Sequence, residues 1–180
     1  MEAQMTIFLA SPTREEAKFQ SNEIMVTQSD LTGKLIYCND TYCRVMEITT
    51  AEARGQSIDF CWHPDMPRSL LKRVFASDPN DLELFLYIKH MTKSGKFVWV
   101  LAQISSLYDQ NNEHIGFNSI RRHVKPEVVQ HISDLYRSLQ SEEQRHADPE
   151  AGIAAGEALL DAMLADQGHD YPQFIWSILG

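Results

Sequence analysis

The side chains best suited to ligand binding or chemistry lie in one short stretch, residues 60–71, which reads FCWHPDMPRSLL. It sets the indole of Trp62, the imidazole of His63 and the carboxylate of Asp65 directly ahead of a run with helical spacing. An aromatic ring beside a few directed polar groups suits the binding of a planar ligand. Structural roles are open as well, because Trp62 can be a core or lid residue and His63 or Asp65 can cap the following helix.

Around this stretch the sequence predicts an antiparallel sheet interrupted by short helices. Two apolar runs, residues 23–28 and 34–38, flank the turn signal SDLTGK and predict a hairpin. Capping residues at Asn39 or Asp40 predict a short helix, and a second helix is expected to end near residue 55. Later runs separated by KSGK and DQNNEH predict three more strands. We expect an α+β fold of about five strands, with helices on one face and a ligand pocket between the layers.

A change in charge marks a boundary near residue 125. Residues 1–125 carry 14 basic and 15 acidic residues, whereas residues 126–180 carry two basic and ten acidic residues. We therefore divide the chain into an N-terminal segment (1–21), a mixed domain (22–124) and an acidic helical extension (125–180). Apolar residues recur in the extension at helical spacing, which predicts an antiparallel helical pair that also supports a homodimer.

The composition excludes several classes of protein. A net charge of −9 argues against nucleic acid and against anionic membrane surfaces as main partners. No apolar run approaches the ~18–20 residues needed to span a bilayer. The three cysteines, Cys38, Cys43 and Cys61, have no zinc-site spacing, and a reducing, cytoplasmic location is the simplest inference. No common catalytic motif is present, so we expect a protein that is not an enzyme and acts through a partner.

Three segments together resemble a known family. NDTYCRVMEITTAEARGQ, then HPDMPRSLLKRVF, then KSGKFVWV are similar to the PAS domain of bacterial aerotaxis receptors, over roughly residues 22–124. That family has a five-stranded antiparallel sheet with short helices, binds FAD non-covalently and reports redox state to the chemotaxis machinery. The resemblance implies a flavin cofactor and a signalling partner, either a chemoreceptor or a kinase component.

The resemblance also implies six cofactor-binding candidates. Asn39 matches an asparagine at the start of the first helix, and His63 and Asp65 match the histidine and aspartate of the HPDMP motif. Trp62 takes the place of an arginine, Leu84 that of a tryptophan and His90 that of a later asparagine. Either the basic residues on the following helix, namely Arg68, Lys72 and Arg73, or the N-terminus of that helix is expected to replace the missing arginine at the FAD pyrophosphate.

Two alternatives to the flavin remain open. Haem is the first, held by one axial histidine, for which His63 and His90 are the candidates, or by Met66 or Met91. A cofactor-free interaction module, closed by its own side chains, is the second. Near the end of the sheet, Asn118 and Ser119 are further candidates to face the pocket, whereas residues 121–123 are expected to form a solvated strand end.

Overall fold

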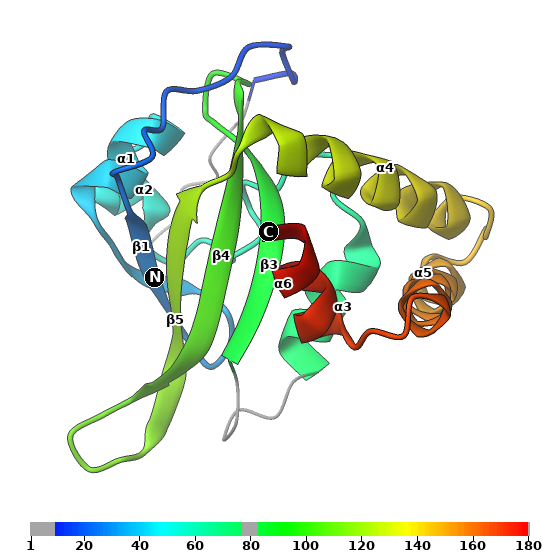
Figure 1. Ribbon diagram of the computed structural model, residues 1–180. Coiled ribbons are helices and arrows are strands. Elements are labelled where there is room, and N and C mark those ends of the chain that lie inside the picture. Colours follow the sequence, from blue (N-terminus) through cyan, green and yellow to red (C-terminus); the bar gives the residue numbers. More distant parts are fainter. Residues whose placement is uncertain (1–9, 77–82, 180) are drawn as a thin grey trace. The chain divides into compact units, whose positions relative to one another are not determined.

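The computed structural model describes residues 10–76 and 83–179 and separates into two compact units. The sheet unit comprises residues 1–63 and 78–123, and the helical unit comprises residues 64–77 and 124–180. Figure 1 labels the elements, which are β1 (Met25–Asp30), β2 (Leu35–Cys38), α1 (Asp40–Met46), α2 (Thr50–Ala53), α3 (Arg68–Ala76), β3 (Glu83–Met91), β4 (Phe97–Tyr108), β5 (His114–His123), α4 (Pro126–Glu143), α5 (Pro149–Asp166) and α6 (Tyr171–Leu179).

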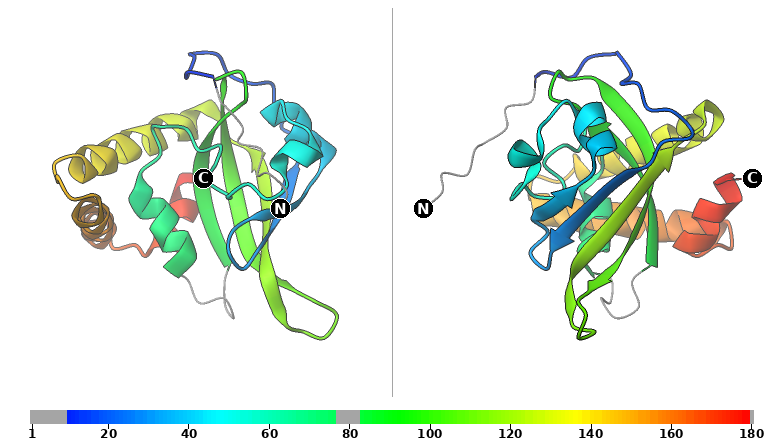
Figure 2. Two further views of the ribbon diagram at one scale, coloured as in Figure 1. Left: turned by 180° about the vertical axis from the view of Figure 1, so that it is seen from behind. Right: turned by 90° about the vertical axis from the view of Figure 1, so that its left-hand side faces the viewer.

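The sheet unit is built on a five-stranded antiparallel sheet in the order β2-β1-β5-β4-β3. The predicted first hairpin is β1 with β2, and the three later runs are β3, β4 and β5. The short helices α1 and α2 lie beside β1 and β2 (Figure 2). The expected α+β fold, with five antiparallel strands and short helices, is therefore confirmed.

Strand register defines one face of this sheet, which we call the inner face. Arg121 on β5 pairs with Met25 on β1 and with Ala102 on β4, so these three side chains lie on the same face. Every second residue along each of these strands lies on that face as well. His90 falls on the same face through its pairing with Val98. The buried residues of the inner face are Met25, Thr27, Ser29, Leu35, Cys38, Leu86, Ile88, His90, Val98, Val100, Ala102, Ile104, Ser119 and Arg121.

Asn39 fixes the start of α1 on the sheet. Its side-chain oxygen accepts hydrogen bonds from the amides of Tyr42 and Val26, both at 3.0 Å, and its Nδ2 donates to the carbonyl of Ile24 at 2.9 Å. The first bond is the predicted helix cap, and the other two hold the helix against β1. The position of Tyr42 in the core follows from this anchor.

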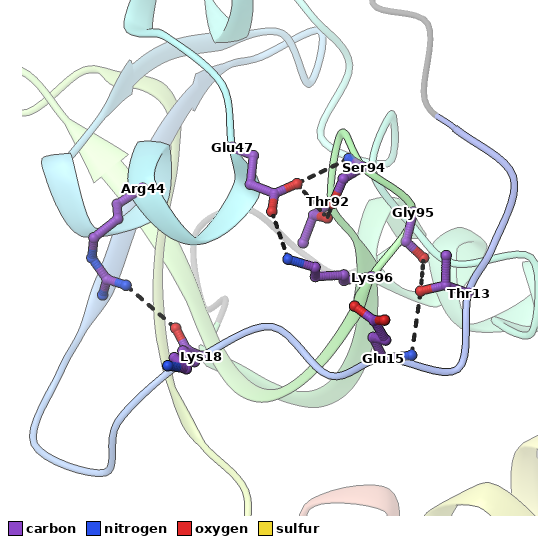
Figure 3. Close-up of polar contacts among 9 residues, drawn as sticks. All are labelled: Thr13, Glu15, Lys18, Arg44, Glu47, Thr92, Ser94, Gly95 and Lys96. Carbon is purple, nitrogen blue, oxygen red and sulfur yellow. Dashed lines mark hydrogen bonds and ion pairs between the residues drawn. The ribbon is translucent and has the colours of Figure 1, made fainter.

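Glu47 fixes the other end of α1, as Figure 3 shows. It ends the helix in the left-handed conformation, with a φ of 59°. Its carboxylate accepts hydrogen bonds from the Thr92 hydroxyl at 3.0 Å and the Ser94 amide at 2.9 Å, and it pairs with Lys96 at 3.4 Å. The β3–β4 turn is thereby tied to α1.

The same turn also holds the N-terminal segment. The Thr13 amide and hydroxyl both donate to the Gly95 carbonyl, at 2.8 and 3.2 Å (Figure 3). Gly95 has a φ of 88°, and a Cβ there would collide with the carbonyl of Ser11. Glycine is therefore required at this position for both its conformation and the close approach of the two segments.

The helical unit begins its long helices where the sequence predicts them. Pro126 opens α4, and Asp148 caps α5 by accepting from the Ala151 amide at 3.2 Å. In Figure 1 the view is down the axis of α5, whereas α4 lies across the picture. The two helices therefore cross and do not form the expected antiparallel pair. Gly152 permits this crossing, because a Cβ there would collide with the carbonyl of Glu143 at the end of α4.

Glu143 also joins α3 to α4. Its carboxylate accepts from the amides of Arg68 and Ser69, at 3.0 and 2.9 Å, and from the Ser69 hydroxyl at 2.7 Å. It thus satisfies the free amides at the start of α3. The sequence suggested Asp65 or His63 as the cap, and the structure shows that these two amides donate to a carboxylate more than 70 positions away.

Replacing Glu47 tests the tie between α1 and the β3–β4 turn. Hydrogen bonds from Ser94, followed by those from Thr92 and Lys96, lower the pKa of Glu47 from 4.5 to about 2. The stability that its carboxylate provides is therefore present above pH 4.5 and is lost as the pH falls toward 2. We expect Glu47→Gln to lower the free energy of unfolding by about 1–2 kcal/mol at pH 7 and to reduce its dependence on pH in that window.

Urea unfolding between pH 2 and 7 measures both effects. Glu113→Gln, at an exposed position in the β4–β5 turn, is the matched control. A Glu47→Gln profile that follows the native one across the whole range would show that this carboxylate does not hold the turn.

Candidate functional site

The segment after α2 pairs with the outer edge of the sheet and brings Trp62 to His90. The amide of His63 donates to the Lys89 carbonyl at 2.9 Å, and the amide of Met91 donates to the Cys61 carbonyl at 2.7 Å. Trp62 and His90 are thereby paired as antiparallel neighbours. Two of the six predicted site residues are therefore adjacent, at the edge strand β3.

A chain of polar side chains runs inward from His90. Its Nδ1 lies 3.2 Å from the Cys61 sulfur, and the Tyr42 hydroxyl lies 3.4 Å from the same sulfur. All three side chains are buried. When the hydroxyl donates to sulfur and the thiol donates to Nδ1, the imidazole carries its proton on Nε2.

Arg121 is the cation of this region. It is 4% exposed, donates from Nη1 to the Thr27 hydroxyl at 2.8 Å, and holds its guanidinium 5.5 Å from the centre of the Tyr42 ring. Within residues 10–76 and 83–179, no carboxylate forms an ion pair with it. The expectation of a solvated strand end was wrong at this position, because alternation turns Arg121 to the inner face and leaves Arg122 exposed.

Burial sets the protonation states around Arg121. Burial, followed by the Arg121 charge, holds the pKa of His90 well below its usual value. Burial raises the pKa of Cys61 to about 11 and that of Tyr42 well above its usual value. At neutral pH the imidazole, thiol and phenol are therefore uncharged, and the guanidinium supplies the one positive charge among these four groups.

Among the residues that the structure describes, three buried polar atoms on the inner face have no hydrogen-bond partner. They are Nε2 of His90, Nε of Arg121 and the hydroxyl oxygen of Ser119. Buried polar groups are normally paired, so each such group calls for a ligand or a bound water. Nε of Arg121 is a donor, the Ser119 hydroxyl can donate or accept, and Nε2 of His90 donates in the tautomer described above, so the set suits a ligand that presents acceptor atoms and tolerates a positive charge.

The chemistry of this donor set suits a flavin edge, although the rest of the protein covers the three atoms and a bound ring would require neighbouring groups to move. An isoalloxazine ring is planar and carries carbonyl oxygens and ring nitrogens along one edge, and these atoms accept hydrogen bonds. His90, Arg121 and Ser119 would hold that edge, while Tyr42 and Trp62 offer aromatic surface. Ser119 was a candidate to face the pocket and does lie on the inner face, whereas Asn118 lies on the opposite face.

The other predicted residues are spread more widely. Asn39 anchors α1 with all three of its hydrogen bonds. His63 is buried beside the bridge at His90, and Leu84 is half-buried on the inner face, six residues from His90 along β3. Asp65 is exposed and belongs to the helical unit.

The basic residues expected to bind a pyrophosphate are largely engaged elsewhere. Lys72 pairs with Glu157 at 2.8 Å, and Arg73 pairs with Asp161 and lies over the ring of Tyr171. The amides at the start of α3 are taken by Glu143. Of the three residues that the sequence suggested, only Arg68 keeps an exposed side chain outside these ion pairs.

The helical unit carries a surface feature of its own. An apolar groove of about 370 Å³ lies among α4, α5 and α6. Its lining includes Leu135, Leu160, Met163, Leu164, Phe174 and Ile178, with His131 and Asp134 among the polar residues.

None of the described helices is long and apolar enough to cross a membrane.

Comparison with known proteins gives a consistent family. Residues 22–124 match the family model described as a PAS domain. The aerotaxis receptor of Escherichia coli (strain K12) is 23% identical over 129 residues, which are 72% of this chain and 25% of the receptor. Phototropin-1A of Oryza sativa subsp. japonica is 24% identical over 79 residues, 44% of this chain and 9% of that protein. The chain thus spans a quarter or less of the length of these relatives.

Solved structures show the same fold. The PAS domain of a protein from Colwellia psychrerythraea has a TM-score of 0.50 at 20% identity, and covers 56% of this chain and 86% of that one. A light-oxygen-voltage domain, from a structure that concerns a flavin analogue, has a TM-score of 0.52 at 13% identity and covers 68% and 87% of the two chains.

A substitution at Arg121 separates a structural role from a ligand-binding one. A buried cation without a carboxylate costs several kcal/mol of desolvation, so Arg121→Met is expected to leave the unfolding free energy of the ligand-free protein unchanged or raise it by about 1–2 kcal/mol. Arg122→Met is the matched control, since the neighbouring side chain is exposed, and should change stability by less than about 0.5 kcal/mol. Denaturant unfolding measures both variants. A large loss of stability in Arg121→Met would assign the arginine to the fold alone.

Proposed function

The chain belongs to the PAS domain family through residues 22–124, and we propose that it is a sensory protein that binds a flavin on the inner face of its sheet. One observation carries the proposal. His90, Arg121 and Ser119 each keep a buried polar atom without a partner on that single face. FAD is the form of flavin that the resemblance to aerotaxis receptors implies.

The sensing step would use the hydrogen bonds of these residues. A bound flavin supplies reversible uptake of electrons and protons, which changes the hydrogen bonding along its edge. His90, neutral through burial, would donate from Nε2, and Arg121 would favour added negative charge. Because His90 is paired through its backbone neighbours with residues 61–63, a change in its hydrogen bond would reach that segment.

Haem is the second candidate ligand, and the observation that favours it is the unpartnered Nε2 of His90. An axial histidine commonly binds iron through one ring nitrogen while its other nitrogen is hydrogen-bonded. His90 has this arrangement, with Nδ1 beside the Cys61 sulfur and Nε2 unpartnered. Arg121 and Ser119 are better explained by a flavin, because a haem needs no additional donors at its metal.

We propose that the helical unit carries the output to a signalling partner, and that the protein is a binding module without catalytic activity. The aerotaxis resemblance favours a chemoreceptor or kinase component as that partner. Trp176 on α6 is 54% exposed, and the apolar groove adjoins the same helix, which supports a homodimer through this unit. A cytoplasmic location is part of the proposal and rests on the three free cysteines.

The absorption spectrum of freshly purified protein tests flavin binding. We expect the visible and near-ultraviolet bands of a flavin, with FAD identified by mass after release. Arg121→Met and His90→Leu should each weaken flavin affinity about tenfold or more through the loss of a directed hydrogen bond. Trp62→Ala and His63→Ala should lower occupancy as well. Arg122→Met should retain full occupancy.

A colourless protein with no released ligand would instead favour the cofactor-free interaction module, and a Soret band would assign haem. Full flavin retention in both Arg121→Met and His90→Leu would remove the inner face as its binding site.

Amide hydrogen exchange tests the output. Because β5 runs directly into α4 at Pro126, we expect reduction of the flavin to change exchange rates in residues 126–179 by several-fold. The comparison is between oxidised and chemically reduced protein, with flavin-free Arg121→Met as the control that should not respond. Equal protection in both redox states would argue against the helical unit as output. Sedimentation of the same samples gives the oligomeric state.

A further inference from the structure

The two cysteines other than Cys61 lie in direct contact with each other. Cys38 is the last residue of β2 and Cys43 lies in α1, and their sulfur atoms are 3.4 Å apart. Both are free thiols. A disulfide has a sulfur–sulfur bond of about 2.05 Å, so closing one here needs an approach of only about 1.4 Å.

The fold holds this contact in place. Asn39 lies between the two cysteines and ties the start of α1 to β1 through its three hydrogen bonds. Cys38 is paired with Thr27 in the β1–β2 ladder, and Cys43 also lies 3.6 Å from the Thr50 hydroxyl at the start of α2. The two sulfur atoms are therefore brought together by three elements and not by a flexible loop.

The two thiols differ in accessibility. Cys43 is half-buried and Cys38 is 6% exposed, while the third cysteine, Cys61, is fully buried. Burial, followed by the contact with Cys43, raises the pKa of Cys38 to about 11, so Cys38 stays a thiol at neutral pH. An oxidant from solvent would therefore meet Cys43 first, with Cys38 already in position behind it.

We propose that Cys43 and Cys38 form an oxidation site for hydroperoxides that closes into an intramolecular disulfide. The Cys43 thiol gives up its proton, the thiolate attacks one peroxide oxygen, and the O–O bond breaks. Cys43 becomes a sulfenic acid, and the released alkoxide or hydroxide takes up that proton and leaves as alcohol or water. The Cys38 sulfur then attacks the sulfenic sulfur, and hydroxide leaves with the Cys38 proton as water. Two thiols lose two electrons, and the hydroperoxide takes both.

Closing the disulfide would move residues on either side of Arg121 on the inner face. Cys43 follows Tyr42, whose hydroxyl contacts Cys61 and whose ring lies against Arg121. Cys38 pairs with Thr27, which accepts the Arg121 hydrogen bond. The thiol pair thus gives the protein a second redox input, and its existence does not depend on a bound flavin.

Alkylation and mass analysis test the site. The 180-residue protein is treated with hydrogen peroxide, blocked with iodoacetamide, unfolded and digested. We expect one cross-linked product that joins Cys38 to Cys43 and has lost two hydrogen atoms, with Cys61 alkylated only after unfolding. Dithiothreitol should restore both thiols. The result should be the same with and without cofactor, which separates it from flavin binding.

Serine variants give the controls. Cys38→Ser should stop at a sulfenic acid on Cys43 that dimedone traps, and Cys43→Ser should give no cross-link. Cys61→Ser should form the native disulfide at the native rate. The proposal is overturned if Cys38 and Cys43 stay fully alkylatable after peroxide, or if the cross-link involves Cys61 or a second chain.

Discussion

The buried guanidinium of Arg121, which pairs with no carboxylate among the residues that the structure describes, sets the chemistry of the inner face. Its one hydrogen bond to Thr27 and its approach to the Tyr42 ring leave Nε without an acceptor. The same charge, added to burial, keeps the imidazole of His90 neutral. A ligand that presents acceptor atoms to this face would offset the desolvation of the cation, so the affinity for that ligand and the stability of the empty protein are opposed.

Most of the fold follows from signals between near neighbours in sequence. Asn39 caps α1, Pro126 opens α4 and Asp148 caps α5, and each of these acts on residues at most three positions away, so sequence alone predicts them. The crossing of α4 and α5 depends instead on the approach of Gly152 to Glu143, and the cap of α3 depends on Glu143 across the chain. Contacts of this kind have no local pattern, and the antiparallel helical pair and the Asp65 cap were expected in their place.

The candidate site was predicted only in part, because some of its contacts also join residues that are far apart in the sequence. Trp62 and His90 were both candidates, and the structure pairs them across the edge of the sheet. Arg121 was missed because two adjacent arginines at a strand end suggest solvent, although the alternation from Ser119 identifies which one turns inward. The contacts of Cys61 with Tyr42 and His90 join three separate elements, and no spacing in the sequence indicates them.

The helical unit is assembled from two separate stretches of chain, and this limits how the protein can be dissected. The family match ends at residue 124, yet it encloses residues 64–77, which fold with the C-terminal helices. A polypeptide truncated after β5 would retain α3 while losing Glu143, Glu157 and Asp161, the carboxylates that hold it. We therefore expect fusion or domain-exchange studies to need the acidic extension as well as the region of homology, so that α3 keeps these partners.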